Sequence, residues 1–498
     1  MRMEIRDFAL KSLFLFPALF AIQFAFATFE FTPQILSAHK QIYNLYLKDA
    51  SRILDRESSA SPENMAVVAS RVLLLFAEAT AADVDEITRR NLLQIKKILK
   101  DIESDKNQSI HHLLARIEIF IYSGMLQLRL NNRWRSASEF LSAYNLAKSA
   151  YSHYPKDAMV KLLWGNMIAT IGSLPPEMRK YLSIIGFSGD VQKGLSLMKS
   201  AHKSIISQKQ YKPYLTKANL LYILTYKQLI DNEEVIPEKE GINIHDNLVT
   251  AIICAKILME QGYNDRALAI LETIKQHPGQ AKLHYYNFLL GKARLAAGST
   301  DAEPVFLSFL NEYRGIHHIK ATYKYLSWHY LLNDDLSKAD SMRLLIPSVG
   351  ASVIGPDQQA AREAEVPLNK VLIKARVLFD GGYLEKSLNV LLSDSTLDCC
   401  TLPDEKAEYY YRLGRIYQKQ GLPYLAINAF EKAVEIHDNP AFNRANSALQ
   451  AALLFEKLGN YNRARSYFQM CLAMKNFPYY EGLHQKAKAG LIRIDAVQ

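Results

Sequence analysis

The sequence has few residues that break helices or crosslink a small fold: its 498 residues include 21 glycines, 17 prolines and 4 cysteines. All-β sandwiches and barrels need a turn signal about every ten residues, so this composition argues against both. Four cysteines are too few for a disulfide scaffold of this length. Hydrophobic residues at 49% and charged residues at 22% are typical of a globular protein and exclude wholesale disorder and a polytopic membrane protein.

Motifs that carry chemistry are also lacking. The sequence contains no Walker A motif, no Gly-x-Gly-x-x-Gly, no His-Glu-x-x-His and no Gly-x-Ser-x-Gly elbow. His111-His112 and His317-His318 are adjacent pairs, and neighbouring helical residues point about 100° apart, so neither pair can share a metal without further ligands. We interpret these histidines as solvated or helix-edge residues. We therefore expect a protein that is not an enzyme and that has no cofactor and no metal site.

The N-terminus carries an apolar stretch over residues 12–27, which ends in Ala25 and Ala27 at the two positions that a signal peptidase reads. The stretch is shorter than the ~20 residues that span a bilayer as a helix. We predict that residues 1–27 are a cleaved signal peptide and that the mature chain begins near Thr28, outside the cytoplasm. The expected location is periplasmic or cell-envelope associated, and an uncleaved N-terminal membrane anchor is the alternative.

Two of the four cysteines form an adjacent pair, Cys399-Cys400, in a polar stretch. Adjacent cysteines cannot supply a tetrahedral metal site alone, and no further ligand lies at the right spacing. A loop pair of thiols is the favoured interpretation, and a strained vicinal disulfide is the alternative. Cys254 and Cys471 fall at inward-facing helical positions, where cysteine behaves as a small apolar residue.

From Gln34 onward, apolar residues recur at i, i+3, i+4 and i+7, which predicts an all-α protein. A longer pattern lies on top of this periodicity near the C-terminus. Residues 407–440 contain Tyr410, Leu413, Gly414, Tyr417, Gly421, Ala426, Phe430, Ala433 and Pro440. Residues 445–478 repeat the spacing with Phe455, Gly459, Tyr461, Ala464, Phe468, Cys471 and Pro478. Decayed copies of the frame begin around Ala255, Gly291, Tyr323 and Ala375.

This pattern resembles the tetratricopeptide repeat superfamily. The resemblance implies a right-handed α-solenoid of helical hairpins over residues 247–498, about six units long, whose concave face binds a protein or peptide partner. Residues 28–232 are expected to form a less regular helical domain with decayed repeats. Residues 233–246 are polar and are predicted to be a linker between this domain and the repeat array.

A narrower resemblance lies at residues 164–195, which contain Trp164-Gly165, Leu174-Pro175-Pro176, Gly186-Phe187-Ser188-Gly189-Asp190 and Gly194-Leu195. This order of motifs is similar to the tetratricopeptide repeat protein 39 family, which has no established catalytic residues. A glycine-rich turn that enters a helix could bind phosphate through the backbone N–H groups at the start of that helix. We favour a structural turn in which Asp190 is the helix N-cap.

Charge is unevenly distributed along the chain, whose net charge is +10. Residues 179–227 contain nine basic residues and one acidic residue, Asp190. This stretch could contact an anionic lipid surface, a polysaccharide or an acidic partner, so peripheral membrane contact through residues 179–227 is possible. The favoured interpretation is a set of solvated lysines above apolar stripes. Nucleic acid is not an expected partner because the charge is scattered and the chain carries an export signal.

The concave face can be assigned by counting along the first helix of each expected unit, because the resemblance implies which positions face inward. Counting from Ala407 places Glu408, Tyr411, Arg415, Gln418 and Lys419 on that face. The complete predicted groove comprises Lys256, Lys292, Trp328, Arg376, Tyr411, Arg415 and Lys419. This basic surface with aromatic anchors suits an acidic or C-terminal carboxylate segment that carries one large apolar side chain.

Two classes of function follow from these observations. The first is an exported non-enzymatic scaffold that binds a protein or peptide partner on its concave face, in a cell-envelope role. The second is an exported glycan- or lipid-related binding protein or enzyme with its site in the N-terminal half. The first is favoured because the second requires convergent acid, base or metal-binding residues that the sequence does not display.

Overall fold

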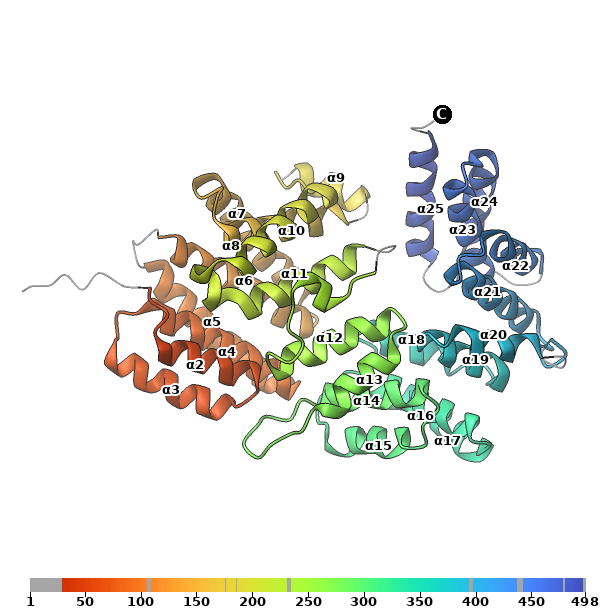
Figure 1. The fold of residues 1–498 in the computed structure, drawn as a ribbon, viewed down its shortest axis with the longest axis horizontal. Helices are drawn as coiled ribbons and strands as arrows, with labels where there is room; N and C mark the ends of the chain where they lie inside the picture. The colour runs from red at the N-terminus through yellow and green to blue at the C-terminus, as the bar shows by residue number, and fades with distance from the viewer. Residues whose placement is uncertain are drawn as a thin grey trace, which may run out of the picture.

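A computed structural model describes residues 29–104, 109–174, 176–184, 186–230, 234–393, 397–436, 442–477 and 480–495. The predicted signal peptide lies outside these residues. Within them the secondary structure is helical throughout, and the helices stack as hairpins in a solenoid, so the predicted all-α solenoid fold is confirmed (Figure 1).

The N-terminal half stacks hairpins around its own apolar core. Its helices pair as α2 with α3, α4 with α5, and α6 with α7, while α8 pairs with α10 and α9 is inserted between them. The elements are α2 (Pro33–Tyr43), α3 (Leu47–Ala60), α4 (Met65–Ala82), α5 (Asp85–Ser104), α6 (Ile110–Arg129), α7 (Arg133–His153), α8 (Ala158–Gly172), α9 (Pro176–Ile184), α10 (Val191–Ser207), the 3₁₀ helix η1 (Lys209–Tyr214) and α11 (Leu215–Leu229).

The C-terminal half pairs its helices in the same way, and in its described residues the first helix of each pair also packs on the first helix of the next. The pairs are α12 (Leu248–Glu260) with α13 (Asn264–Thr273), α14 (His284–Ala296) with α15 (Ala302–Glu312), α16 (Ile319–Leu332) with α17 (Leu336–Leu345), α19 (Lys370–Asp380) with α20 (Leu384–Leu392), α21 (Pro403–Lys419) with α22 (Pro423–Glu435), and α23 (Phe442–Lys457) with α24 (Tyr461–Ala473). Helix α25 (Tyr480–Asp495) covers the last pair, α18 (Gly355–Glu363) is an insertion against α16, and η2 (Pro237–Glu240) and η3 (Ile346–Ser348) are short 3₁₀ helices.

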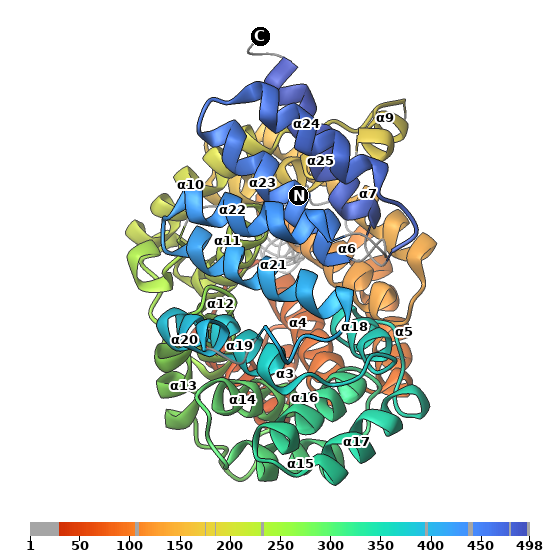
Figure 2. The same cartoon turned by 90° about the vertical axis from the view of Figure 1, so that its right-hand side faces the viewer.

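The chain curves back on itself. Helices α12 to α16 form the base of the molecule, and the arm made of α21 to α25 rises from them opposite the N-terminal half (Figure 1). From the side, this arm stands in front of α10 and α11 (Figure 2). The first helices of the C-terminal pairs therefore face inward, toward the N-terminal half.

The turn inside each hairpin uses one backbone conformation. A residue with positive φ ends the first helix of five C-terminal pairs, at Gly262, Gly298, Gly382, Gly421 and Gly459. Glycine adopts this conformation without the strain that a Cβ atom brings. In the remaining C-terminal pair Asp334 takes the same place, and in the N-terminal half Leu45, Asp83 and Asn131 take it. The repeat frame thus continues into the N-terminal half with non-glycine turn residues.

Small residues let the two helices of a hairpin approach closely. A Cβ atom at Gly414 would lie 2.5 Å from the ring of Phe430, and one at Gly124 would lie 3.0 Å from the ring of Phe140. The two glycines precede their phenylalanines by the same interval, one pair in each half of the chain. The same packing device therefore operates in α21–α22 and in α6–α7.

The glycine-rich turn before α10 is a packing element. Asp190 caps α10, because its side chain accepts a hydrogen bond from the Lys193 amide at 2.9 Å, as predicted. A Cβ atom at Gly189 would lie 2.1 Å from the backbone nitrogen of Gly172, and one at Gly194 would lie 2.6 Å from the Gly165 carbonyl oxygen. These glycines bring α8 and α10 into close contact.

Residues 234–246, within the predicted linker, are packed rather than extended into solvent. Val235, Ile236, Ile242 and Ile244 are buried in an apolar cluster that runs from α6 to α16. The Gln261 side-chain amide donates to the Val235 carbonyl oxygen at 2.8 Å, and its oxygen accepts from the Val235 amide at 2.7 Å. This segment joins α11 to α12 through the core, and the division into two domains stays a prediction.

Among the described helices, α4 has the length and apolar composition of a membrane-crossing segment. It packs against α2, α3, α5 and α6, with Val67 and Val72 buried. Its apolar face thus contributes to the core of the N-terminal half.

A buried polar junction connects the end of α4 to the loop before α16. The Asp83 carboxylate forms an ion pair with Arg129 and accepts a hydrogen bond from Nδ1 of His317 at 2.9 Å. His317 lies at a helix edge, as interpreted, but it is buried rather than solvated. Cys399 and Cys400 are not joined by a disulfide in the structure, in agreement with the favoured loop pair.

Candidate partner-binding groove

All seven residues of the predicted groove line one large cavity. Its volume is about 2470 Å³, and its walls are the first helices α12, α14, α16, α19, α21 and α23 together with α18, α25 and the end of α11. The repeat frame explains this result, because equivalent positions of successive first helices point the same way. The predicted residues on this wall are Lys256, Lys292, Trp328, Arg376, Tyr411, Arg415 and Lys419.

The lining carries eleven basic and eight acidic residues. Several of the carboxylates are already neutralised by neighbours on the same wall. Glu260 pairs with Lys256 at 2.5 Å, and Glu456 accepts two hydrogen bonds from Arg493, at 2.6 and 2.7 Å. Glu408 pairs with Arg412. The cations that have no carboxylate beside them are left to give the groove its basic character.

Near the base of the groove, aromatic rings are stacked with cations. Lys324 and Arg376 each lie 4.8 Å from the ring centroid of Trp328, whose residue is 4% exposed. Trp328 was predicted to be an aromatic anchor, but these two side chains cover its ring. Its contribution is to hold the wall in place, because cation–π contacts strengthen when they are desolvated.

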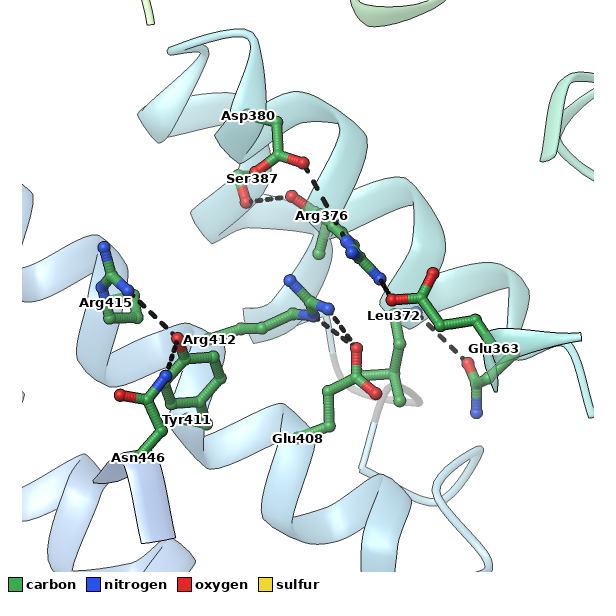
Figure 3. Close-up of polar contacts among 12 residues, drawn as sticks. Glu363, Leu372, Arg376, Asp380, Ser387, Glu408, Tyr411, Arg412, Arg415 and Asn446 are labelled. Carbon is green, nitrogen blue, oxygen red and sulfur yellow. Dashed lines mark hydrogen bonds and ion pairs between the residues drawn. The ribbon is translucent and has the colours of Figure 1, made fainter. Parts of the chain in front are cut away.

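Glu363 is the central carboxylate of this cluster. It comes from the inserted helix α18 and pairs with Arg376 at 3.0 Å (Figure 3). It also pairs with Lys324 at 3.2 Å. Burial raises the pKa of a carboxyl group, but the charges of Lys324 and Arg376 outweigh burial here and lower the pKa of Glu363 to about 2. Burial also lowers the pKa of Arg376, and Glu363 and Asp380 more than offset it, so that the pKa of Arg376 is raised.

Lys292 and Tyr325 lie beside this cluster. The Lys292 ammonium is 5.5 Å from the ring centroid of Tyr325 and has no carboxylate partner among the described residues. Burial raises the pKa of the Tyr325 phenol, but the charges of Lys292 and Lys324 outweigh it, so its pKa is lowered. The electrostatic potential at this point of the wall is therefore positive.

Higher in the groove, a chain of hydrogen bonds links α21 to α23. The Tyr411 hydroxyl accepts from Nη1 of Arg415 at 3.0 Å and from the Asn446 amide at 2.9 Å (Figure 3). Gln450 donates to the Asn446 oxygen at 3.2 Å and accepts from Gln418 at 3.1 Å. These bonds orient Tyr411 and Arg415, so both present fixed polar groups to the cavity.

Arg415 is a cation of the groove that lacks a carboxylate partner among the described residues. Its guanidinium stacks 5.7 Å from the ring centroid of Phe379, and no carboxylate lies within 4.0 Å of it in the described part of the chain. Its Nε atom is buried without a hydrogen-bond partner. The charge of Arg415 therefore has no counter-ion on the wall, and this favours an anion that enters the cavity.

Lys419 and Lys227 complete the basic end of the groove. Partial burial and the positive charges of Arg415 and Lys227 lower the pKa of Lys419. Lys227 belongs to α11 in the N-terminal half, yet it lines the same cavity. Seven of the other basic residues between 179 and 227 are exposed, as the solvated interpretation predicted, and Lys217 pairs with the buried Glu118.

Glu363 and Lys227 are the groove residues that sequence reasoning missed. Glu363 lies on an insertion outside the repeat frame, so the count along first helices could not include it. Lys227 lies within the basic stretch of residues 179–227. The excess of basic over acidic residues in that stretch is the one signal in the sequence that includes it. Its place in the groove depends on how the two halves fold together.

Comparison with known proteins agrees with this architecture. Residues 405–476 match the tetratricopeptide repeat family, over the two hairpins α21–α22 and α23–α24. These residues are therefore similar to tetratricopeptide repeats, a class of helical scaffold that generally serves protein–protein interaction. No curated protein sequence matches it.

Similar solved structures include three helical proteins. The crystal structure of yeast Tom70 is 10% identical, with 85% of this chain and 88% of that chain covered and a TM-score of 0.31. The APC/C hetero-tetramer Cut9–Hcn1 is 12% identical, with 93% of each chain covered and a TM-score of 0.25. The human IFIT1 dimer with PPP-AAAA is 12% identical, with 89% and 95% covered and a TM-score of 0.25.

Proposed function

We propose that this protein is a non-enzymatic scaffold that binds an acidic protein or peptide segment on the concave face of its C-terminal repeats. The observation that carries the proposal is that Arg415, on the wall of a cavity of about 2470 Å³, has no carboxylate within 4.0 Å among the described residues. An incoming carboxylate would accept hydrogen bonds from this guanidinium and would offset the charge of Lys419.

An extended segment fits the shape of the site better than a small molecule does. Ligand pockets for small molecules are typically about 300–1,000 Å³, and this cavity is larger. Lys292 at the base and Arg415 higher on the wall are separate positive points along the groove. A segment with acidic side chains at more than one position would meet both.

Charge reversal at Arg415 and Lys419 tests this proposal. We expect Arg415→Glu combined with Lys419→Glu to abolish partner capture, at a cost of roughly 2–4 kcal/mol in binding free energy. Neither side chain fills the core between helices, so helical content and melting temperature should stay near wild type. The measurement is affinity capture with immobilised protein, followed by mass spectrometry of the bound proteins.

The matched control reverses two lysines on the outer surface of α5. Lys96→Glu with Lys97→Glu changes the net charge equally, but both residues are exposed and lie outside the groove. This control should capture the same partners as wild type. If the Arg415/Lys419 variant captures them too, the concave face is not the binding surface.

We further propose that the chain is exported and acts in the cell envelope, as the apolar residues 12–27 suggest. N-terminal sequencing of the natural protein should begin near Thr28, and an intact Met1 in a cytosolic fraction would contradict this. Kinship with the tetratricopeptide repeat protein 39 family is likewise a proposal, supported by the motifs in residues 164–195.

A further inference from the structure

The end of α11 provides a positive charge on the wall opposite the repeats. Lys227 lies in the last turn of α11, and it lines the same cavity as Arg415 and Lys419 of α21. Figure 2 places α11 behind α21, and Figure 1 shows the end of α11 directed toward the arm. The charge of Lys227 reaches far enough to perturb Lys419.

These three cations share one feature: within the described residues, none of them has a carboxylate within 4.0 Å. The eight acidic residues of the lining lie elsewhere on the wall, and several are engaged with other cations. Like charges that converge without a counter-ion repel one another and destabilise the apo state. A ligand anion that arrives among them removes this repulsion.

Hydrogen-bond donors are available at the same place. Among the described residues the Arg415 guanidinium makes one hydrogen bond, to the Tyr411 hydroxyl, which itself accepts two hydrogen bonds and donates none. Both are donors, and so are the two lysines. The site therefore suits an acceptor with several oxygen atoms, such as a carboxylate pair.

We propose that Lys227 is a ligand-binding residue, so that an acidic peptide segment is held between the N-terminal half and the C-terminal arm rather than on the repeats alone. The inference rests on the proposed function, and it adds a second wall to the binding site. It also specifies the ligand: two neighbouring carboxylates suit the site, because three cations line it and a single carboxylate offsets the charge of only one of them.

The arm is the part that a bound segment would fix in place. Helices α21 to α25 pack mainly on α19, α20 and one another, which leaves the arm attached to the base by its first pair. A stack of repeats bends by small changes at each junction. An anion shared by Lys227 and Arg415 would connect the free side of the arm to α11.

The test measures fluorescence anisotropy of a labelled oligoglutamate peptide that ends in phenylalanine, at low salt. We expect Lys227→Gln to weaken its binding about tenfold, since one of three converging charges is lost. Lys227→Arg should keep the affinity because it keeps the charge. The matched control is Lys212→Gln on η1, an exposed lysine outside the cavity, which should bind as wild type does.

A double-mutant cycle of Lys227→Gln with Arg415→Gln adds a second readout. Two residues on one shared anion should show effects that are not additive. If Lys227→Gln binds like wild type while the Arg415/Lys419 reversal does not, the groove binds the peptide and the second wall is wrong. If wild type does not bind the peptide, or if the reversal has no effect, the proposed function fails and the inference fails with it.

Discussion

Asp83→Asn is expected to lower the free energy of unfolding by about 1–3 kcal/mol, because burial raises the pKa of Asp83 and so offsets part of what its pairing with Arg129 and His317 contributes. Asp83 ends α4 with a positive φ of 52° and pairs with Arg129, whose side chain is 15% exposed. It is the only acidic partner of Arg129 among the described residues. Asparagine tolerates the left-handed backbone and keeps the side-chain shape, so the variant isolates the loss of charge. Urea denaturation at neutral pH measures the effect.

The control is Asp85→Asn, two residues further on. Asp85 is exposed and lies 3.5 Å from Arg89 on the surface of α5, so its removal should change stability by less than about 1 kcal/mol. Arg129→Gln alone should lower the free energy of unfolding. Combined with Asp83→Asn it should lower it little further, because the double variant leaves neither charge of the pair buried without its partner. Equal stability of Asp83→Asn and wild type would show that this junction does not stabilise the fold.

The junction matters because it joins distant parts of the chain. His317 is 234 residues from Asp83, and its loop approaches α4 closely at Gly315, where a Cβ atom would lie 2.4 Å from the Asp83 carbonyl oxygen. Such a contact holds the base of the C-terminal repeats against the N-terminal half. The wall that carries Lys227 and the wall that carries Arg415 are positioned relative to each other through contacts of this kind.

The sequence was sufficient to predict the fold class and the wall of the groove. Gly421 and Gly459 mark the turn of two hairpins, and once the frame is set, the periodicity of the first helix determines that Tyr411 and Arg415 face inward. Local physics governs both steps: backbone conformation at the turn and helical spacing along the face.

The missed features depend on tertiary structure. Leu45, Asp83 and Asn131 adopt the turn conformation without glycine, so the frame in the N-terminal half leaves a weak trace in the sequence. Glu363 enters the groove from an insertion, and Lys227 enters it from the other half of the chain. No periodic pattern connects such residues, because the closure of the solenoid brings them together.

Glu363→Gln is expected to lower the free energy of unfolding by about 3 kcal/mol at pH 7. The change leaves Lys324, which is 4% exposed, and Arg376 on the groove wall without the carboxylate between them. The size of the effect follows from the fall in the pKa of Glu363 from 4.5 to about 2. Glutamine keeps the shape of the side chain, so packing should be preserved.

The pH dependence gives this prediction a distinctive signature. A carboxylate whose folded-state pKa is lowered stabilises the fold fully above its unfolded pKa of 4.5, and this stabilisation disappears as the pH falls through about 2. Wild type should therefore lose stability relative to Glu363→Gln as urea denaturation is repeated at decreasing pH below about 5. Glu365→Gln, an exposed change two residues away, should follow the wild-type curve. Parallel curves for wild type and Glu363→Gln across this range would show that Glu363 is not the counter-ion that holds Lys324 and Arg376 in the groove wall.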